Sequence, residues 1–280
     1  MSVNISTAFV TLFDSEVKQA YQGQRLLAGV TRERTGVQGN TVKFPKIGKG
    51  SATIRVPQTD VVPLNVTYSQ VTATMEDFIA AEYSDIFDQS HVNFSERQEL
   101  VQVVSGAIAR RMDQVVLDAL TAASGTNTVA NSIGGSNTNL NVAKLRAAKK
   151  ALDAKNVPAD GRCFVIHANS LDSLLSETEV TSSDFASVKA LVTGDVDTFL
   201  GFQFITMGDR DEGGLAIDGS NDRTLFAFHK DAMGLGVSMN QTSRVDYIAE
   251  KTSFLVASMF SAGSVAIDAD GIVKVTCRES

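Results

Sequence analysis

Two short stretches in the first third of the chain alternate between apolar and polar residues. Their apolar positions are Ala52, Ile54 and Val56 in the first stretch, and Leu64, Val66 and Tyr68 in the second. A period of two is typical of a strand with one wetter face. The segment between them, residues 57–63, begins and ends with proline. The pattern therefore predicts a long β-hairpin over residues 39–82.

Both strands of this expected hairpin carry an irregularity. After Tyr68 the apolar positions shift to Val71, Ala73 and Met75, which predicts a bulge near Ser69–Gln70. The first strand is interrupted by Lys46, Gly48, Lys49 and Gly50. An isolated two-stranded ribbon is marginally stable in water. Because the preceding segment is too polar to cover the apolar face of the ribbon, we expect a neighbouring subunit to cover it.

A long amphipathic helix is predicted next, over residues 95–123. Ser95 and Gln98 fit a capping box at its start. One apolar stripe consists of Leu100, Val104, Ile108, Met112, Val115 or Val116, and Ala119. Wetter positions are Glu99, Gln102, Arg110 and Asp113. Residues 124–140 are rich in Ser, Thr, Asn and Gly and are expected to form a loop.

The chain before the hairpin is predicted to be a polar arm, residues 1–38. Its first part has apolar residues at helical spacing, among them Phe9, Leu12 and Phe13. After Leu27 the pattern lapses, and residues 31–39 are expected to be an extended linker.

Helices and strands alternate over residues 141–240. Asn141 is expected to cap a helix that ends near Pro158. A buried strand at 163–166, a helix through Leu171 and Leu175, a helix at 185–192, and strands at 201–205 and 225–228 follow. Residues 243–260 are predicted to contain one long strand, and 265–275 two strands around an Asp-Gly turn.

Composition and charge narrow the range of possible functions. The net charge of −7 argues against tight binding to duplex nucleic acid, which requires clustered cations. The N-terminus does not resemble a signal peptide, and no apolar run approaches the ~20 residues that a membrane-spanning helix needs. The two cysteines, Cys163 and Cys277, are expected to be buried free thiols.

Motifs for catalysis or metal binding are weak. Residues 48–51, Gly-Lys-Gly-Ser, lack the spacing of a phosphate-binding loop and lie within a predicted hairpin. The three histidines, at 91, 167 and 229, lie in different segments, which disfavours a shared metal site. We therefore expect no catalytic residues, no cofactor and no metal.

One acidic loop leaves an alternative open. Residues 209–222 contain Asp209, Asp211, Glu212, Asp218 and Asp222. Such carboxylates are ligands for a hard cation such as calcium, although their spacing does not match an EF-hand. A solvated loop is the other interpretation.

The order of these segments resembles that of the major capsid proteins of tailed bacteriophages, which have the Hong Kong 97-type fold. The similarity is greatest to the short-tailed podovirus group. It extends over nearly the whole chain, and it depends on the order of the motifs because no single one is diagnostic. The matching motifs are Gly39-Asn-Thr-Val-Lys-Phe-Pro45 with Gly48, the proline-tipped hairpin, Glu82–Asp88, the long helix with Ala109–Asp113, Leu145–Leu152, Val157–Arg162, and Gly201-Phe202.

The resemblance implies an α+β fold with named parts. Residues 1–38 would be the N-terminal arm and 39–82 the extended loop that lies over an adjacent subunit. Residues 83–136 and 241–261, with the spine helix 95–123, would form the peripheral domain. Residues 137–240 and 262–280 would form the axial domain.

The same resemblance implies a structural function. Chains of this kind assemble through pentamers and hexamers into an icosahedral phage head that encloses double-stranded DNA. A scaffolding protein and a portal are the expected partners, with weak, non-specific contact to the packaged DNA and no membrane. The expected location is the virion capsid, after assembly in the cytoplasm of the bacterial host.

Interfaces, rather than a catalytic pocket, would then carry the function. The residues expected at intersubunit interfaces are Phe9, Leu12 and Phe13 in the arm, and Ile54, Val56, Leu64, Val66 and Tyr68 in the hairpin. Some capsid relatives crosslink a hairpin lysine to an asparagine of another subunit. Candidates by position are Lys43, Lys46 and Lys49, although the podovirus group is not expected to crosslink.

Two alternatives to a phage head remain. An encapsulin-like cellular compartment has the same fold and holds enzyme cargo. A soluble hydrolase with an unrecognised site belongs to a different class and would be a small oligomer instead of a shell.

Overall fold

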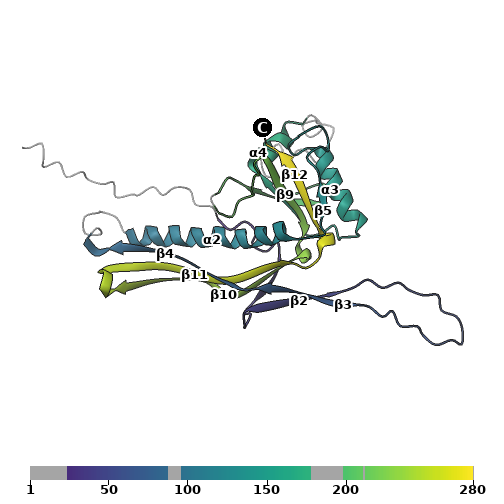
Figure 1. The fold of residues 1–280 in the computed structure, drawn as a ribbon, viewed down its shortest axis with the longest axis horizontal. Coiled ribbons are helices and arrows are strands. Elements are labelled where there is room, and N and C mark those ends of the chain that lie inside the picture. The colour runs from purple at the N-terminus through teal and green to yellow at the C-terminus, as the bar shows by residue number, and fades with distance from the viewer. Residues whose placement is uncertain (1–23, 88–95, 178–197, 211, 280) are drawn as a thin grey trace, which may run out of the picture.

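Two β-sheets and one projecting hairpin organise the chain in the computed structural model, which describes residues 24–87, 96–177, 198–210 and 212–279. The four-stranded sheet has the order β1-β10-β11-β4 and the six-stranded sheet the order β5-β12-β9-β6-β8-β7. The hairpin pairs β2 with β3. In Figure 1 the four-stranded sheet lies along the long axis, the six-stranded sheet stands above it, and the hairpin projects beyond one end.

The four-stranded sheet supports the long helix. Its strands are β1 (Arg32–Thr35), β10 (Met233–Ile248), β11 (Ser253–Ala266) and β4 (Glu76–Asp85). Helix α2 (Glu96–Ala122) packs on one face of β11 and β4. At 1.5 Å per residue it is about 40 Å long. On this face Phe78 stacks on Phe260 with ring centroids 5.0 Å apart, and the Arg111 guanidinium lies 4.5 Å from the Phe78 ring.

Helix α2 confirms the predicted stripe and corrects one position. Val104, Ile108 and Val116 are buried. Asp113, predicted to be wetter, is fully buried. The proposed capping serine, Ser95, lies outside the described residues.

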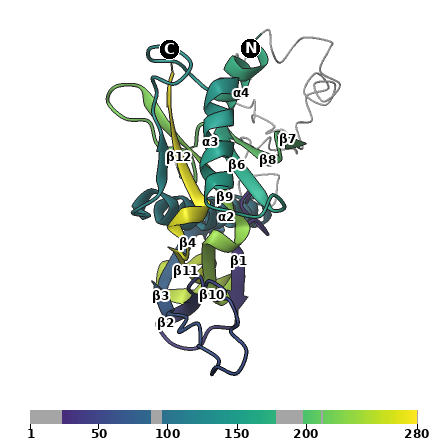
Figure 2. The same ribbon diagram turned by 90° about the vertical axis from the view of Figure 1, so that its right-hand side faces the viewer.

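The six-stranded sheet holds most of the predicted alternation of helix and strand. Its strands are β5 (Asn127–Val129), β6 (Arg162–His167), β7 (Thr198–Phe199), β8 (Phe202–Met207), β9 (Asp222–His229) and β12 (Ile272–Arg278). Helices α3 (Val142–Ala154) and α4 (Ala168–Leu175) accompany it (Figure 2). As predicted, the Asn141 side chain caps α3 by accepting a hydrogen bond from Lys144 N. The helix predicted at 185–192 lies outside the described residues.

Three predictions about strands and loops are wrong. The single strand at 243–260 is a hairpin, in which β10 turns into antiparallel β11 through the short 3-10 helix Ala249–Lys251. The expected linker at 31–39 contains β1, which pairs in parallel with β10. The expected loop at 124–140 contains β5, which pairs in parallel with β12. The prediction of two strands around the Asp-Gly turn is confirmed, since β11 and β12 flank it, and the two strands belong to different sheets.

The hydrogen-bonded part of the projecting hairpin is shorter than predicted. Strands β2 (Thr41–Ile47) and β3 (Tyr68–Thr74) pair in continuous register, from Thr41 with Thr74 to Ile47 with Tyr68. The predicted bulge near Ser69–Gln70 is therefore wrong, because the shift in phase reflects the start of β3. The strands predicted at 51–56 and 64–68 are also wrong up to Thr67, since residues 48–67 form an irregular tip.

The base of the hairpin packs on the chain's own body. Val42 and Phe44, with Ala73 and Met75, form a small buried core against Ile267. Three glycines make this close approach possible. A Cβ atom at Gly234 would lie 2.8 Å from the Phe44 ring, while one at Gly236 or Gly263 would collide with Met75 or Thr74. The expectation that another subunit covers the whole ribbon is therefore wrong for its base.

None of the helices in the described part of the chain is long and apolar enough to cross a membrane.

Candidate assembly surface

The hairpin tip, residues 48–67, exposes a run of large apolar side chains. Ile54 is 95% exposed and Val61 92% exposed, and the others that lie open are Val56, Val62 and Leu64. Tyr68, the first residue of β3, is exposed as well, whereas Val66 is half-buried beside Gly50. Contiguous exposed apolar surface marks an interaction site. The structure thus places the five predicted hairpin residues together on one projection; Phe9, Leu12 and Phe13 lie outside the described residues.

Few backbone hydrogen bonds hold the tip together. The last cross-strand bond runs from Gly48 N to Thr67 O at 2.8 Å. Between residues 49 and 66 the two arms form no backbone ladder. Strand groups without partners are available to pair with another chain.

Ion pairs hold the base of the hairpin at the junction of the two sheets. Lys46 Nζ lies 2.8 Å from Asp268 Oδ1, and Lys49 Nζ lies 3.7 Å from Asp270 Oδ2. Lys155, after α3, lies 3.0 Å from the other Asp270 oxygen. The hydrogen bond from Lys155 is the main cause that lowers the pKa of Asp270. Two of the three crosslinking candidates, Lys46 and Lys49, therefore pair with carboxylates of their own chain.

The arm is anchored through buried Asp113. Its two carboxylate oxygens accept hydrogen bonds from Leu26 N at 2.9 Å and Leu27 N at 3.0 Å. Arg210 lies 3.3 Å from Oδ2 of the same carboxylate. Burial raises the pKa of Asp113, and the two backbone bonds and Arg210 oppose this effect. The sequence pattern missed this anchor because an aspartate within a helix stripe gives no sign of a distant partner.

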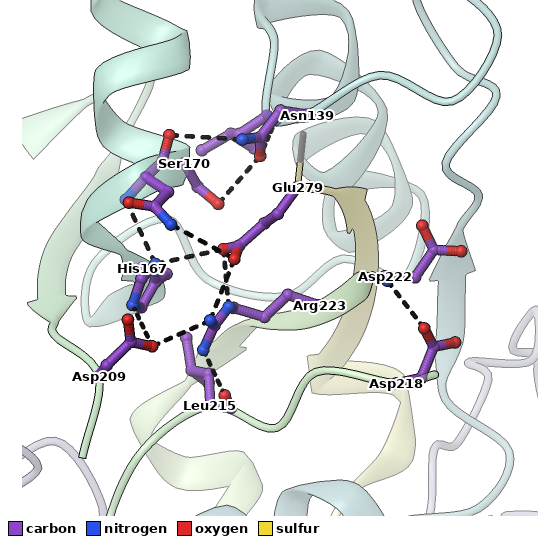
Figure 3. Close-up of polar contacts among 11 residues, drawn as sticks. Asn139, His167, Ser170, Asp209, Leu215, Asp218, Asp222, Arg223 and Glu279 are labelled. Carbon is purple, nitrogen blue, oxygen red and sulfur yellow. Dashed lines mark hydrogen bonds and ion pairs between the residues drawn. The ribbon is translucent and has the colours of Figure 1, made fainter. Parts of the chain in front are cut away.

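A buried polar network occupies the far end of the six-stranded sheet (Figure 3). Arg223 on β9 holds Glu279, which follows β12, through two bonds of 2.7 and 3.0 Å. Arg223 also donates to Asp209 Oδ1 at 3.0 Å. His167 lies between the two carboxylates, 3.1 Å from Asp209 and 3.2 Å from Glu279. Arg223 donates to both carboxylates, so these hydrogen bonds tie Glu279 and Asp209 to β9.

Three carboxylates of the acidic loop at 209–222 pair with arginines, and Asp211 lies outside the described residues. Asp209 faces Arg223, Glu212 lies 2.9 Å from Arg111, and Asp222 lies 2.6 Å from Arg278. The hydrogen bond from Arg278 is the main cause that lowers the pKa of Asp222. Among the described residues no group of three or more His, Cys, Asp or Glu side chains is placed to hold a metal ion. The arrangement gives no support to the alternative of a cation site.

The described histidines and cysteines have local structural contacts. Nδ1 of His167 and of His229 each accepts a backbone hydrogen bond at the start of a short helix. Cys163 and Cys277 are buried free thiols, as predicted. Burial raises the pKa of Cys163 to about 11 and that of Cys277 to about 12, so neither thiol is a ready nucleophile. His91 lies outside the described residues.

Lys144 on α3 is a buried cation beside Cys277. Its Nζ donates to the carbonyls of Thr138 and Thr276, the latter at 3.0 Å, and lies 3.9 Å from Cys277 Sγ. Burial lowers its pKa. The two carbonyl acceptors explain why this lysine is tolerated in the core.

Comparison with known proteins identifies the class of this protein. The family described as phage capsid protein matches residues 5–279. A search of curated proteins finds no match. Among solved structures, the chain is similar to the capsid of cyanophage P-SCSP1u, with 16% identity, a TM-score of 0.78, and coverage of 100% of this chain and 96% of the other.

Other similar structures also come from bacteriophages. The head of Helicobacter pylori bacteriophage KHP40 matches with 12% identity, a TM-score of 0.77 and 99% coverage of both chains. The structure described as Mycobacterium phage Che8 matches with 19% identity, a TM-score of 0.72, and coverage of 94% and 95%.

The chain belongs to the phage capsid protein family. Its fold is the Hong Kong 97-type capsid fold, and it is a structural protein that forms the phage head and resides in the virion capsid. This confirms the predicted fold class and function. The comparisons do not favour the encapsulin-like alternative.

Proposed function

We propose that the hairpin tip binds the neighbouring subunit in the pentamers and hexamers of the head. The observation that supports this is the exposure of Ile54, Val56 and Leu64 on a projection whose base is already covered. Burial of a few hundred Å² of apolar surface at this tip would contribute roughly 10 kcal/mol per contact, before the cost of ordering.

The expected domain names fit this arrangement as a proposal. Residues 83–136 and 241–261, which include helix α2 and the turn end of the β10–β11 hairpin, would form the peripheral domain. The six-stranded sheet with α3 and α4 would form most of the axial domain near the capsomer centre. The hairpin would be the extended loop, and residues 1–38 the arm, docked through Phe9, Leu12 and Phe13.

Other partners belong to the same proposal. A scaffolding protein and a portal would take part in assembly, because a closed shell of one subunit type needs control of its curvature and an entry point for DNA. The net charge of −7 supports weak, non-specific contact with the packaged double-stranded DNA.

Deleting residues 50–68 tests the proposal directly. The deletion keeps the pair Lys46–Ser69 and leaves Ile47–Lys49 to close a short turn, so the base of the hairpin is retained. We expect a soluble subunit that fails to form shells, as measured by sedimentation and negative-stain microscopy. A variant with Asp172→Asn, on exposed α4 surface, is the control and should assemble normally. Normal shells from the deletion variant would overturn the proposal.

A further inference from the structure

Helix α2 is attached to the six-stranded sheet at its C-terminal end. The chain runs from Ala122, the last residue of the helix, into strand β5, which begins at Asn127. From β12, Lys274 Nζ donates to the carbonyl of Thr121 at 2.8 Å and to that of Ala123 at 2.7 Å. In Figure 1 the six-stranded sheet stands above this end of the helix. An attachment at one end alone would leave the angle between helix and sheet free to change.

A second attachment lies near the middle of the helix. It is made by three residues from the connection between β8 and β9, here called the strut: Arg210, Glu212 and Gly213. Glu212 lies 2.9 Å from Arg111, and Gly213 N donates to Gln114 Oε1 at 2.9 Å. Arg210 lies 3.3 Å from Asp113. Because Asp113 is about 14 Å from the C-terminal end of the helix at 1.5 Å per residue, the two attachments together fix the angle.

The strut fits closely against the backbone of the helix at Gly213. The φ angle of Gly213 is +75°, and a Cβ atom at this residue would lie 2.5 Å from the carbonyl oxygen of Arg110. Residues with a side chain are strained in this left-handed conformation. Glycine therefore allows the strut to contact the helix at this point.

The arm binds the same carboxylate as the strut. Leu26 N and Leu27 N donate to the two oxygens of Asp113 at 2.9 and 3.0 Å. The Arg210 Nη1 atom that lies beside Asp113 also donates to the carbonyl of Gln24 at 3.2 Å. One carboxylate and one guanidinium thus join three segments that are far apart in the sequence: the arm, the helix and the strut.

Burial makes these contacts depend on one another. The side chain of Asp113 is 0% exposed and that of Arg210 is 11% exposed. Removing one partner of a buried charge is strongly destabilising, because the remaining charge is left without compensation. If the arm leaves, Asp113 loses two backbone donors and Arg210 loses a carbonyl acceptor. If the strut leaves, Asp113 loses the guanidinium. Either departure therefore weakens the binding of the other segment.

We propose that Asp113 and Arg210 form a latch that couples docking of the arm to attachment of the strut. Through the strut, the latch also couples the arm to the angle between α2 and the six-stranded sheet. Displacement of the arm loosens the strut, and displacement of the strut loosens the arm by the same factor, as linkage requires. The inference goes beyond the proposed function. Its tests use the free subunit, so they do not depend on which surface receives the hairpin tip.

Gly213→Ala tests the coupling from the side of the strut. The new Cβ atom would collide with the carbonyl of Arg110, while Gly213 is not among the residues that bind the arm. We expect the amide hydrogens of Leu26 and Leu27 in the free full-length subunit to exchange about tenfold faster, as measured by mass spectrometry. Unchanged exchange at these two amides would overturn the inference.

Gly125→Ala is the matched control. Gly125 also has a positive φ angle, +72°, so alanine strains the backbone in the same way. This residue lies between α2 and β5, and the nearest atom to its new Cβ would be that of Ala269 at 3.9 Å. We expect unchanged exchange at Leu26 and Leu27. An equal acceleration there would indicate general loosening of the subunit and would contradict a latch.

Glu212→Gln provides a milder variant in case Gly213→Ala does not fold. It removes the ion pair with Arg111 and alters no backbone atom, and the Glu212 side chain is 37% exposed. Exchange at Leu26 and Leu27 should accelerate about twofold, because partly exposed ion pairs are weak. Here too, unchanged exchange at both amides would count against the coupling.

Leu26→Pro tests the coupling from the side of the arm. Proline removes the backbone N–H that donates to Asp113 and alters no residue of the strut. Because coupling is reciprocal, the amide of Gly213, which donates to Gln114, should exchange about tenfold faster. Full protection of Gly213 in this variant would show that the strut holds without the arm, and the latch would be refuted.

Discussion

The base and the tip of the hairpin belong to one continuous ribbon but differ in how far the subunit buries their side chains. At the base, Phe44 is fully buried against the body of its own subunit, and Gly234 in β10 makes room for its ring. At the tip, about ten residues further along, Ile54 is 95% exposed. The base belongs to the fold of the subunit, whereas the tip has apolar surface that the subunit itself does not cover.

This difference suggests that side chains at the base and at the tip contribute to two different processes, folding of the subunit and assembly of the head. A side chain at the base contributes to the free energy of unfolding of one subunit. Under the proposed function, a side chain at the tip contributes to the free energy of assembly, because another copy would cover it. Substitutions in the two regions should therefore affect different measurements.

Matched truncations at the two positions should give the largest contrast. Phe44→Ala should lower the free energy of unfolding of the subunit by about 4 kcal/mol, because it leaves a cavity in a closed core. Ile54→Ala should change it by less than about 0.5 kcal/mol but reduce shell formation. Urea unfolding of free subunits and sedimentation of assembled protein measure the two effects. A large loss of subunit stability from Ile54→Ala would mean that the tip folds onto its own body.

The buried network around Glu279 provides a second test of a contact that should stabilise the single subunit. Glu279→Gln removes a charge from Arg223, whose side chain is 6% exposed, and should cost about 3 kcal/mol of subunit stability. The matched control Glu250→Gln, in the exposed turn after β10, should have almost no effect. Equal urea midpoints for the two variants would show that the network does not stabilise the subunit.

The ion pairs at the hairpin base should have the smallest effect, with a defined pH dependence. The pKa of Asp270 is lowered from its ordinary value of 3.8. A lowered pKa gives stability that is complete above the unfolded value and lost as the pH falls through the folded value. These pairs are more than a third exposed, so screening limits the contribution to less than about 1 kcal/mol.

Asp270→Asn should therefore destabilise the subunit by the same small amount between pH 7 and pH 5. The difference from wild type should begin to shrink near pH 3.8 and disappear once the pH falls below the lowered pKa of the folded state. Urea midpoints over this pH range provide the measurement. A difference that grows as the pH falls would have the wrong sign for this ion pair.

The strongest periodic segments could be predicted from the sequence. The stripe of α2, the cap at Asn141 and the buried strand before His167 all depend on local patterns, and the structure confirms them. The irregular tip was predicted as two strands because Ile54 and Val56 alternate with polar residues. Alternation indicates which residues would share a face, but it does not supply a partner strand.

Contacts between distant segments could not be predicted in this way. Asp113 looks like a solvent-facing residue of a helix until Leu26 and Leu27 donate to it from 86 or more positions away. Likewise, Gly234 and Gly236 within a strand indicate close approach of another element but not which one. Whether the predicted interface residues bind a neighbour also depends on a second copy of the chain.

Amide hydrogen exchange over residues 50–66 tests the central claim most directly. We predict fast exchange in the free subunit, where the tip has no ladder, and strong protection in the assembled shell, where another copy covers it. Residues 41–47 should be protected in both states and serve as the internal reference. Equal exchange of residues 50–66 in the free subunit and the shell would contradict the account.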